Sequence, residues 1–468
     1  MQYQPAKRHD YGINACPGCF EKQRVIDRLN EEIQQLRMKL SVQKRKDREG
    51  FFGSSTPSAI VPVKANATEE QRLKRGGAKP GHKGSGRRKH REEEVDCVRE
   101  VAVEAICPEC HCVMKEKDYR ERSVLDIDPI RVLKVLYRLQ RRLCPQCRQI
   151  RTAQATEVLP RSMFSNQLIA EIVDSHYVQG MPLGRICARW QLNYGSVIES
   201  LHRMAAIFAP VMKQLQAGYR QSLVRHADET GWRTDGQNGY CWLFASDSVS
   251  LHLYRKTRSA KVVEEVLGKS ALPGYLVVDR YQSYSRAPCK VQYCYAHLMR
   301  DMKDLGQEFA DEKEVEAYSQ EMVERLAQAM RLQSSRPADK EYYREAARIK
   351  EQILEASHKG SHHLAVKRWQ DFFVEKADHL YHWVDDRTVP CENNRAEREL
   401  RPTVIARKVS HGSQADEGAL TREVLMSVMQ TLKKRVADPR QRFKSVLDQL
   451  ALNSQSTIEQ LLFQMDSS

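Results

Sequence analysis

The sequence predicts a multidomain α/β protein whose centre is a mixed β-sheet covered by helices. The chain has 468 residues, which is more than one domain usually contains. In its middle third the apolar pattern takes the period of strands, broken by one helical segment. We read three strands, a helix and a further strand at 223–232, 240–245, 251–254, 260–267 and 274–279. Three antiparallel strands followed by a right-handed crossover to another strand form a mixed sheet.

The N-terminal segment, residues 1–48, is expected to contain a coiled coil. Apolar residues recur there in alternating steps of three and four, at Ile26, Leu29, Ile33, Leu36 and Leu40. This is the a/d seam of about three heptads, which favours a dimer zipper. The alternative is a helix packed on its own chain. Whether the preceding Cys16 and Cys19 bind metal is left open, because no partner pair is evident.

The net charge of +15 indicates a polyanionic partner, and nucleic acid fits best. Residues 49–95 read as a basic, glycine-rich linker that neutralises phosphates without reading sequence. A solvated linker is the alternative. A second basic cluster without acids spans 129–156. The DNA-contact residues predicted in these two clusters are Arg75, Lys79, Lys83, Arg87, Arg88, Lys89, Arg138 and Arg141.

Residues 96–156 are predicted to form a zinc ribbon. Two Cys-x-x-Cys pairs supply four thiolates in two tight turns, at Cys107, Cys110, Cys144 and Cys147. Four thiolates suit tetrahedral Zn²⁺, and a strand over 131–138 is expected between the pairs. Cys97 and Cys112 are spare thiols nearby, so one ligand assignment stays open.

Residues 157–220 have a helical pattern that includes a helix-turn-helix-like segment. Two short helices are expected within 181–198, joined by a turn at Leu192 and Asn193. The chain has no apolar run long enough for a membrane helix and begins without the apolar stretch of a signal peptide, so we expect a cytoplasmic protein without a membrane partner.

Two aspartates occupy special places in the predicted sheet. Asp228 lies on the first strand, and Asp279 ends the fourth after an apolar run. If these strands are neighbours, both carboxylates emerge at one edge, where they would repel each other unless a cation lies between them. Hard oxygen ligands favour Mg²⁺ or Mn²⁺, and a two-metal site clamps both oxygens of a phosphodiester displacement.

A third acid is expected from a helix over 386–410. Asn393, Asn394, Glu397 and Arg401 share one helix face by three- and four-residue spacing. A carboxylate beside an arginine suits a metal ligand next to a phosphate contact. The rival acids, which spacing does not exclude, are Glu229, Glu392 and Glu399.

Several motifs in one order resemble the transposases of the insertion sequence 66 family. They are His226-Ala227-Asp228-Glu229-Thr230-Gly231-Trp232, Asp279 with Tyr281 and Tyr284, Cys294-Tyr295-Ala296-His297-Leu298-Met299-Arg300-Asp301, and Asn393-Asn394-Arg395-Ala396-Glu397-Arg398. The resemblance implies an RNase H-like core and a DDE transposase with Asp228, Asp279 and Glu397 as catalytic, Mg²⁺-binding residues.

The resemblance also implies that the core is divided. Residues 221–306 form its first part, 307–385 a helical insertion, 386–410 the helix with the third acid, and 411–468 a C-terminal helical region. The family usually has Gly after the second Asp, where this chain has Arg280. Cys294 and His297 resemble a pair of zinc ligands, but two ligands are too few for a zinc site. For His297 and Arg300 we therefore expect a packing or DNA-positioning role.

The sequence therefore predicts a bacterial, nucleoid-associated DNA transposase that uses Mg²⁺ or Mn²⁺ and Zn²⁺. Its expected partners are the double-stranded DNA of element ends and target, further copies of itself as a homodimer or larger assembly, and helper proteins of the element. One alternative is an RNase H-like nuclease without strand transfer. The other is a catalytically inactive, zinc-dependent DNA-binding regulator.

Overall fold

The structure of the chain is a computed structural model that describes residues 17–49, 111–113, 132–143, 150–153, 155–453 and 457–463. The chain separates into a unit of residues 1–65 and 136–468 and a second unit of residues 66–135. Several predicted sites lie outside the described residues: Cys16, Arg75, Lys79, Lys83, Arg87, Arg88, Lys89, Cys97, Cys107, Cys110, Cys144 and Cys147. The predictions for the basic linker and the zinc ribbon ligands therefore stay predictions.

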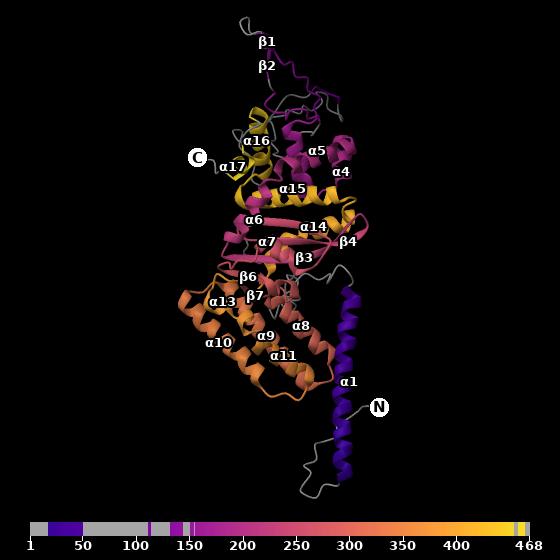
Figure 1. Cartoon of the computed structure of the whole chain (residues 1–468), viewed down its shortest axis with the longest axis vertical. Helices are drawn as coiled ribbons and strands as arrows, with labels where there is room; N and C mark the ends of the chain where they lie inside the picture. Colours follow the sequence, from indigo (N-terminus) through magenta and orange to yellow (C-terminus); the bar gives the residue numbers. More distant parts are fainter. Residues whose placement is uncertain are drawn as a thin grey trace. The chain divides into compact units, whose positions relative to one another are not determined.

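The predicted mixed sheet is confirmed, with one more strand than expected. Its strand order is β5-β4-β3-β6-β7, antiparallel between β5, β4 and β3 and parallel between β3, β6 and β7 (Figure 1). The strands are β3 (Val224–Thr234), β4 (Gln237–Ala245), β5 (Ser250–Arg255), β6 (Tyr275–Val278) and β7 (Lys290–Tyr293). The fifth strand, β7, was not predicted.

Different helices cover the two faces of the sheet, because alternate side chains of each strand point to opposite faces. Ala227 and Phe244 pack in a core with helices α6 (Val211–Gln221) and α7 (Ala260–Leu267). Trp232 and Leu243 pack on the other face, against α14 (Asn394–Ser410). The helix with the predicted third acid therefore covers one face of the sheet.

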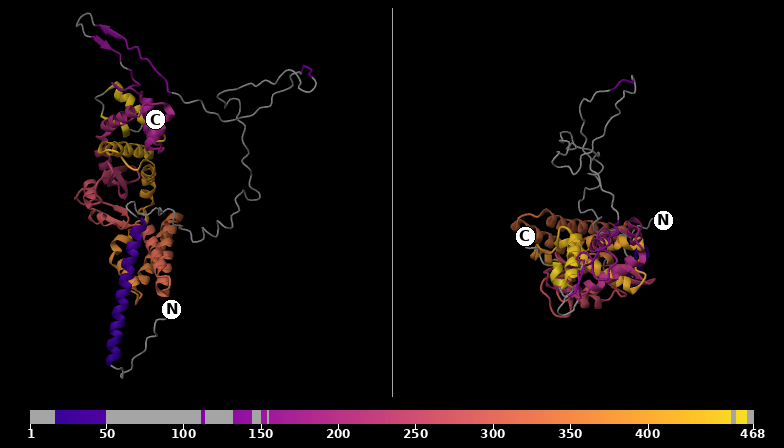
Figure 2. Two further views of the ribbon diagram at one scale, coloured as in Figure 1. Left: turned by 90° about the vertical axis from the view of Figure 1, so that its right-hand side faces the viewer. Right: turned by 90° about the horizontal axis from the view of Figure 1, so that it is seen from above.

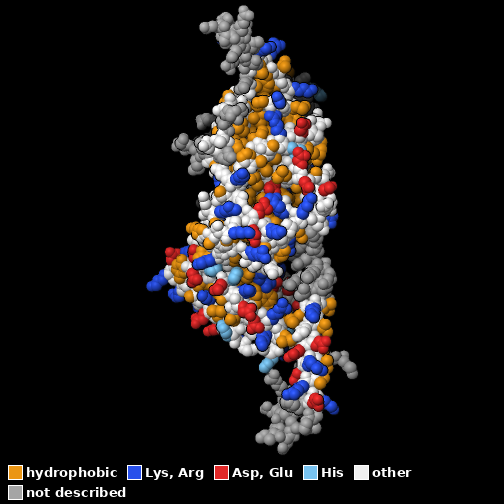
Figure 3. All heavy atoms as spheres, viewed as in Figure 1, with side chains coloured by type: hydrophobic (Ala, Val, Ile, Leu, Met, Phe, Trp, Pro, Cys, Tyr) orange, Lys and Arg blue, Asp and Glu red, His pale blue; other side chains and the backbone are white. Residues whose placement is uncertain are grey.

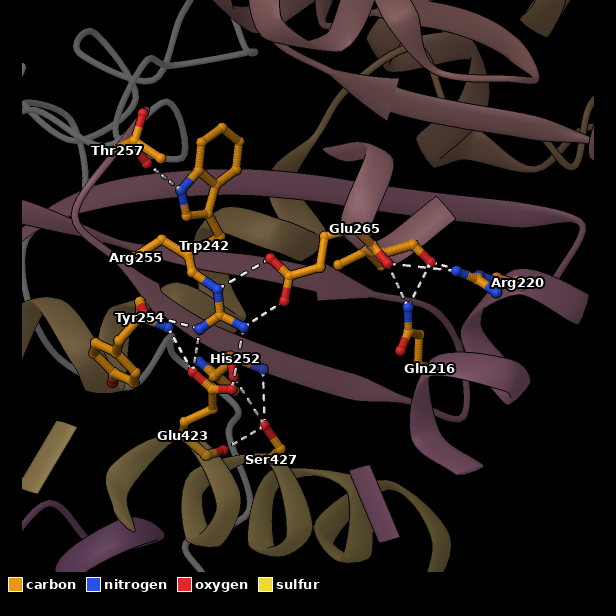
Figure 4. A network of polar contacts seen from close by, with 11 residues as sticks. Gln216, Arg220, Trp242, His252, Tyr254, Arg255, Thr257, Glu265, Glu423 and Ser427 are labelled. Atoms are coloured by element: carbon orange, nitrogen blue, oxygen red, sulfur yellow. Dashed lines mark hydrogen bonds and ion pairs between the residues drawn. The ribbon is translucent and has the colours of Figure 1, made fainter. Parts of the chain in front are cut away.

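The free edge of β5 is closed by side chains of α15 (Asp416–Arg435). The backbone N–H groups of Ser250, His252 and Tyr254 donate in turn to Thr431 Oγ1, Ser427 Oγ and Glu423 Oε2 at 3.0, 2.8 and 2.9 Å. Figure 4 shows Ser427 and Glu423 beside β5. Four residues of helix and two of strand both advance roughly 6–7 Å, so the two rows stay in step. This arrangement satisfies an edge that would otherwise expose unpaired donors.

We expect Ser427→Ala to lower the free energy of unfolding by about 1–3 kcal/mol, because the buried His252 N–H loses its acceptor. Urea denaturation measures this change. Ser335→Ala is the control, since the Ser335 hydroxyl is exposed and bonds only to Leu332 O within its own helix. Equal stability of the two variants would show that the edge contact contributes nothing.

Helices that precede and follow the sheet in the sequence complete the main core, and they include the region predicted to be helix-turn-helix-like. They are α3 (Asn166–Tyr177), α4 (Leu183–Trp190), α5 (Tyr194–Phe208), α16 (Pro439–Leu452) and α17 (Ile458–Phe463). Residues 191–193 join α4 to α5, and Gln191 there is in the left-handed region, which makes the turn tight.

Residues 295–385 form a helical subdomain with a core of its own. Its helices are α8 (Tyr295–Glu308), α9 (Lys313–Ser335), α10 (Asp339–His358), α11 (Leu364–Glu375), α12 (Ala377–Leu380) and α13 (His382–Asp385) (Figures 1 and 2). Helix α8 begins directly after β7, so this subdomain leads out of the sheet at the edge where β6 and β7 end. None of the described helices is long and apolar enough to cross a membrane.

The N-terminal helix and the second basic cluster contain the remaining elements. Helix α1 (Pro17–Glu49) extends through the predicted coiled-coil segment, so Cys19 lies in its first turn. Strands β1 (Arg141–Leu143) and β2 (Ile150–Thr152) form an antiparallel hairpin. The strand predicted over 131–138 was wrong: residues 132–140 have no strand structure, because nothing in the described chain pairs with them.

Candidate active site

Asp228 and Asp279 lie on neighbouring strands, as the sequence prediction required. Strands β3 and β6 are parallel, with Val224 opposite Tyr275 and His226 opposite Val277. Continuing this register by two residues places Asp228 level with Asp279, directly after β6 ends. The paired residues His226 and Val277 point to the same face of the sheet. Asp228 and Asp279 each follow two residues later, and side chains two residues apart along a strand share a face. That is the face covered by α14.

The neighbouring acidic groups are close enough to raise the pKa of Asp228. Burial and the negative charges of Glu229, Asp279 and Glu397 raise the pKa of Asp228 well above its usual value. Burial also raises the pKa of Asp279, and the Tyr281 N–H that its Oδ1 accepts at 2.9 Å opposes this shift. Clustered carboxylates that destabilise one another's charge are typical of a site for a cation.

Glu397 lies in the first turn of α14, which packs on β3 and β4. Its side chain is 10% exposed, and its Oε1 lies 3.9 Å from Nε2 of His297 on α8. Helix α14 therefore brings the third acid to the face of the sheet on which the two aspartates lie, and Glu397 is also close to α8. No three His, Cys, Asp or Glu side chains in the described parts of the chain are close enough to hold a metal ion.

The three rival acids have other partners. Glu229 points to the opposite face of the sheet and pairs with Arg258. Glu399 pairs with Lys434 of α15 at 2.8 Å. Glu392 precedes α14, and its carboxylate is hydrogen-bonded by Asn394. Among the candidate acids, Glu397 is the one whose charge acts on Asp228 from α14.

Glu229 forms a cluster of polar contacts with Arg258 and Tyr284, called the brace below, which the sequence analysis did not predict. Nε and Nη2 of Arg258 donate to Glu229 Oε1 at 2.8 and 2.5 Å, and the Tyr284 hydroxyl donates to Glu229 Oε2. The Arg258 guanidinium also lies 3.8 Å from the ring centre of Tyr281. Burial and the Asp279 carboxylate raise the pKa of Glu229 to about 7. The brace joins β3 to the segment after Asp279, and its two tyrosines were visible in the sequence motif.

Arg280 fits its position without strain. Its backbone is outside the left-handed region that favours glycine. Its side chain pairs with Asp301 of α8, and its guanidinium lies 4.8 Å and 5.1 Å from the ring centres of Trp369 and Phe372 on α11. The arginine that replaces the expected glycine therefore links the end of β6 to the helical subdomain.

Two further residues of the sequence motifs have structural contacts. Trp232 is 1% exposed, and its Nε1 donates to Ser413 Oγ at 3.1 Å, so it is a core residue. Asn393 was expected to share a face with Glu397; instead it precedes the helix, and its side chain bonds to β3. The helix predicted over 386–410 begins only at Asn394, so Asn393 is its N-cap residue.

Four predicted DNA-contact residues are described. Arg138 and Arg141 are exposed, the second of them in β1. Arg401 is exposed on α14, one turn after Glu397, and Arg300 is half-buried on α8, one turn after His297. The last two arginines thus come one turn after residues of the acidic site on their own helices.

A mixed sheet with acidic residues on adjacent central strands is consistent with an RNase H-like core. The family described as Transposase IS66 family matches residues 161–421, which is more than half of the chain. The chain belongs to this family. No curated protein matches it. The match begins before α3 and ends in α15, so it includes all five strands of the sheet and all three acids.

Proposed function

We propose that this transposase cuts element ends and joins them to target DNA, with Asp228, Asp279 and Glu397 as its catalytic acids. The observation that supports this most directly is the register of β3 and β6, which sets Asp228 level with Asp279 on the face that α14 covers. The three groups come from β3, the end of β6 and α14, which are far apart in sequence. The charges of Asp279 and Glu397 also raise the pKa of Asp228, which suits a single site.

The donor set fits Mg²⁺ or Mn²⁺, because all three side chains offer hard carboxylate oxygens. When bound, such ions activate water and stabilise the charge on the attacking and leaving oxygens of a phosphodiester. The chain's own contribution is to hold the three acids on rigid elements. His297, on α8, places its Nε2 3.9 Å from Oε1 of Glu397.

Exposed basic groups near the site support DNA as the substrate. We assign Arg401 and Arg300 to the phosphates next to the scissile bond, and Arg138 and Arg141 to more distant phosphates. Helices α4 and α5 suit a second DNA contact, since Arg185 and Arg189 are exposed one turn apart on α4 and Tyr194 is 49% exposed at the start of α5. The basic linker would add contacts independent of sequence.

Strand transfer separates this proposal from a nuclease of the same fold. Pre-cut element ends with a free 3′ hydroxyl are incubated with supercoiled target DNA and Mg²⁺ or Mn²⁺. Joined products support the transposase proposal. Cutting without joining under all conditions favours the nuclease. Binding without cutting favours the inactive regulator, although the unstrained backbone at Arg280 removes one reason for inactivity.

We also propose that α1 pairs with α1 of a second copy as a parallel coiled coil. Its seam residues are 45–56% exposed: Ile26, Leu29, Ile33, Leu36 and Leu40. Figure 3 shows hydrophobic side chains at the surface of this helix among charged ones. Isoleucine at a and leucine at d favour two parallel strands. Glu32 at g and Arg37 at the following e′ are complementary in that register.

We expect Leu36→Asp to convert the dimer into a monomer, because it places two charges in the middle of a short seam. Sedimentation velocity at micromolar protein measures the change. Gln35→Asp is the matched control: it adds the same charge one residue away, outside the seam. A wild-type monomer, or a dimeric Leu36→Asp variant, would contradict the zipper.

A further inference from the structure

The junction that precedes α14 is tied to two other parts of the site by one buried amide. Asn393 is 1% exposed. Its Nδ2 donates to Ala227 O on β3 at 2.8 Å, and its Oδ1 lies 2.9 Å from Nδ1 of His226. Its backbone N–H donates to the Cys294 thiol at 3.1 Å, at the residue before α8. One residue thus contacts β3 and the start of α8 while it leads into α14.

The donor and acceptor in each of these hydrogen bonds follow from one another. Because Nδ2 of Asn393 is used as a donor to Ala227 O, its Oδ1 is the acceptor, and the His226 ring must donate from Nδ1. Both polar atoms of the Asn393 side chain and its backbone N–H are then used. A buried amide held at both of its ends has one orientation, so it can set the position of the helix that begins at the next residue.

The contacts lie next to the acids in the chain. Ala227 immediately precedes Asp228. The Glu397 N–H donates to Asn393 O at 3.3 Å, so Glu397 lies one helical turn after the amide. Tyr295 N–H also donates to Cys391 O at 2.7 Å, which attaches α8 to the same junction. Helix α8 brings His297 to within 3.9 Å of Glu397.

We infer that Asn393 is a positioning residue that fixes the Glu397 turn of α14 against Asp228 and against α8. This inference rests on the proposed function, because it assigns Asn393 to the three-acid site. Asn393 touches neither the substrate nor the acids themselves; it acts through the backbones on which two of the acids are held. A residue of this kind controls how well the carboxylates converge on a cation.

The test measures Mn²⁺ binding by the full-length, zinc-loaded chain, with calorimetry and the Mn²⁺ electron paramagnetic resonance signal as readouts. Asn393→Ala removes the amide. Asn393→Asp keeps its shape and the oxygen facing His226, but sets an oxygen against Ala227 O. Asn394→Ala is the matched control, because that amide bonds to Glu392 and not to β3. Thermal unfolding and a gel shift on element-end DNA are recorded for each variant.

We expect both Asn393 variants to bind Mn²⁺ about 10- to 100-fold more weakly, the usual effect of losing a residue that orients metal ligands. Asn394→Ala should bind as wild type does, and DNA affinity should stay unchanged in all three. Wild-type Mn²⁺ affinity in both Asn393 variants overturns the inference. So does unfolding of both below the assay temperature, since Asn393 would then serve stability alone.

Asp228→Asn separates this inference from the proposed function. If Asp228→Asn binds Mn²⁺ as wild type does, the proposed acidic site itself is wrong. If Asp228→Asn loses Mn²⁺ while the Asn393 variants keep it, the site stands and only the positioning role is overturned.

Discussion

Replacing Asp228 with Asn is expected to lower the rate of element-end nicking roughly a thousandfold or more, about 4 kcal/mol of barrier. The substitution keeps the shape of the side chain and removes the negative charge. It takes away the carboxylate whose pKa the charges of Asp279 and Glu397 raise. Nicking of supercoiled DNA carrying the element's ends, in Mg²⁺ or Mn²⁺, measures the change.

DNA binding should survive the same substitution. The basic groups remain, and one repulsive charge next to the phosphates is gone, so affinity stays the same or rises slightly. A gel shift at fixed salt measures it. Asp247→Asn is the matched control: it removes the same charge from a side chain that is 89% exposed and pairs with Arg395 at 2.5 Å. Undiminished nicking by Asp228→Asn would remove Asp228 from the catalytic residues, whereas loss of nicking by both variants would point to a general defect.

The central part of the fold was predictable because its signals are local. Each of the strands β3 to β6 shows an apolar pattern within its own few residues, and the right-handed crossover rule orders them. The placement of Asp279 at the end of an apolar run predicted that it would lie beside Asp228 if the two strands were neighbours. The pairing of β3 with β6 meets that condition.

Other features depend on contacts between residues far apart in the chain. Strand β7 has four residues, and its buried Gln292 bonds to Leu380 O at 3.0 Å, so neither length nor pattern marks it as a strand. The bond between His226 and Asn393 joins positions 167 residues apart. No spacing within the sequence indicates such a pair. The same holds for Arg258, which lies in the loop after β5 and whose role depends on Glu229 on β3.

A second large effect, on zinc binding and folding, is expected in the predicted zinc ribbon. Ser at both Cys107 and Cys144 should abolish zinc binding and unfold residues 96–156. Each pair of thiolates would lose one ligand, and structural zinc sites contribute on the order of 10 kcal/mol to folding. The hairpin of β1 and β2 supports this expectation, because the residues that connect these strands include Cys144 and Cys147. A Cys-x-x-Cys pair between paired strands is the usual half-site of a ribbon.

Zinc content by atomic absorption and limited proteolysis of residues 96–156 measure the outcome. Cys112→Ser is the control, since Cys112 is a free, exposed thiol within the same segment. It should keep its zinc and resist proteolysis as the wild type does. Full zinc retention in the double variant would refute the ribbon, and loss of zinc in Cys112→Ser would move one ligand to that position. Nicking of naked DNA at low salt should change less than zinc content, because the three acids lie on β3, β6 and α14, outside the segment that unfolds.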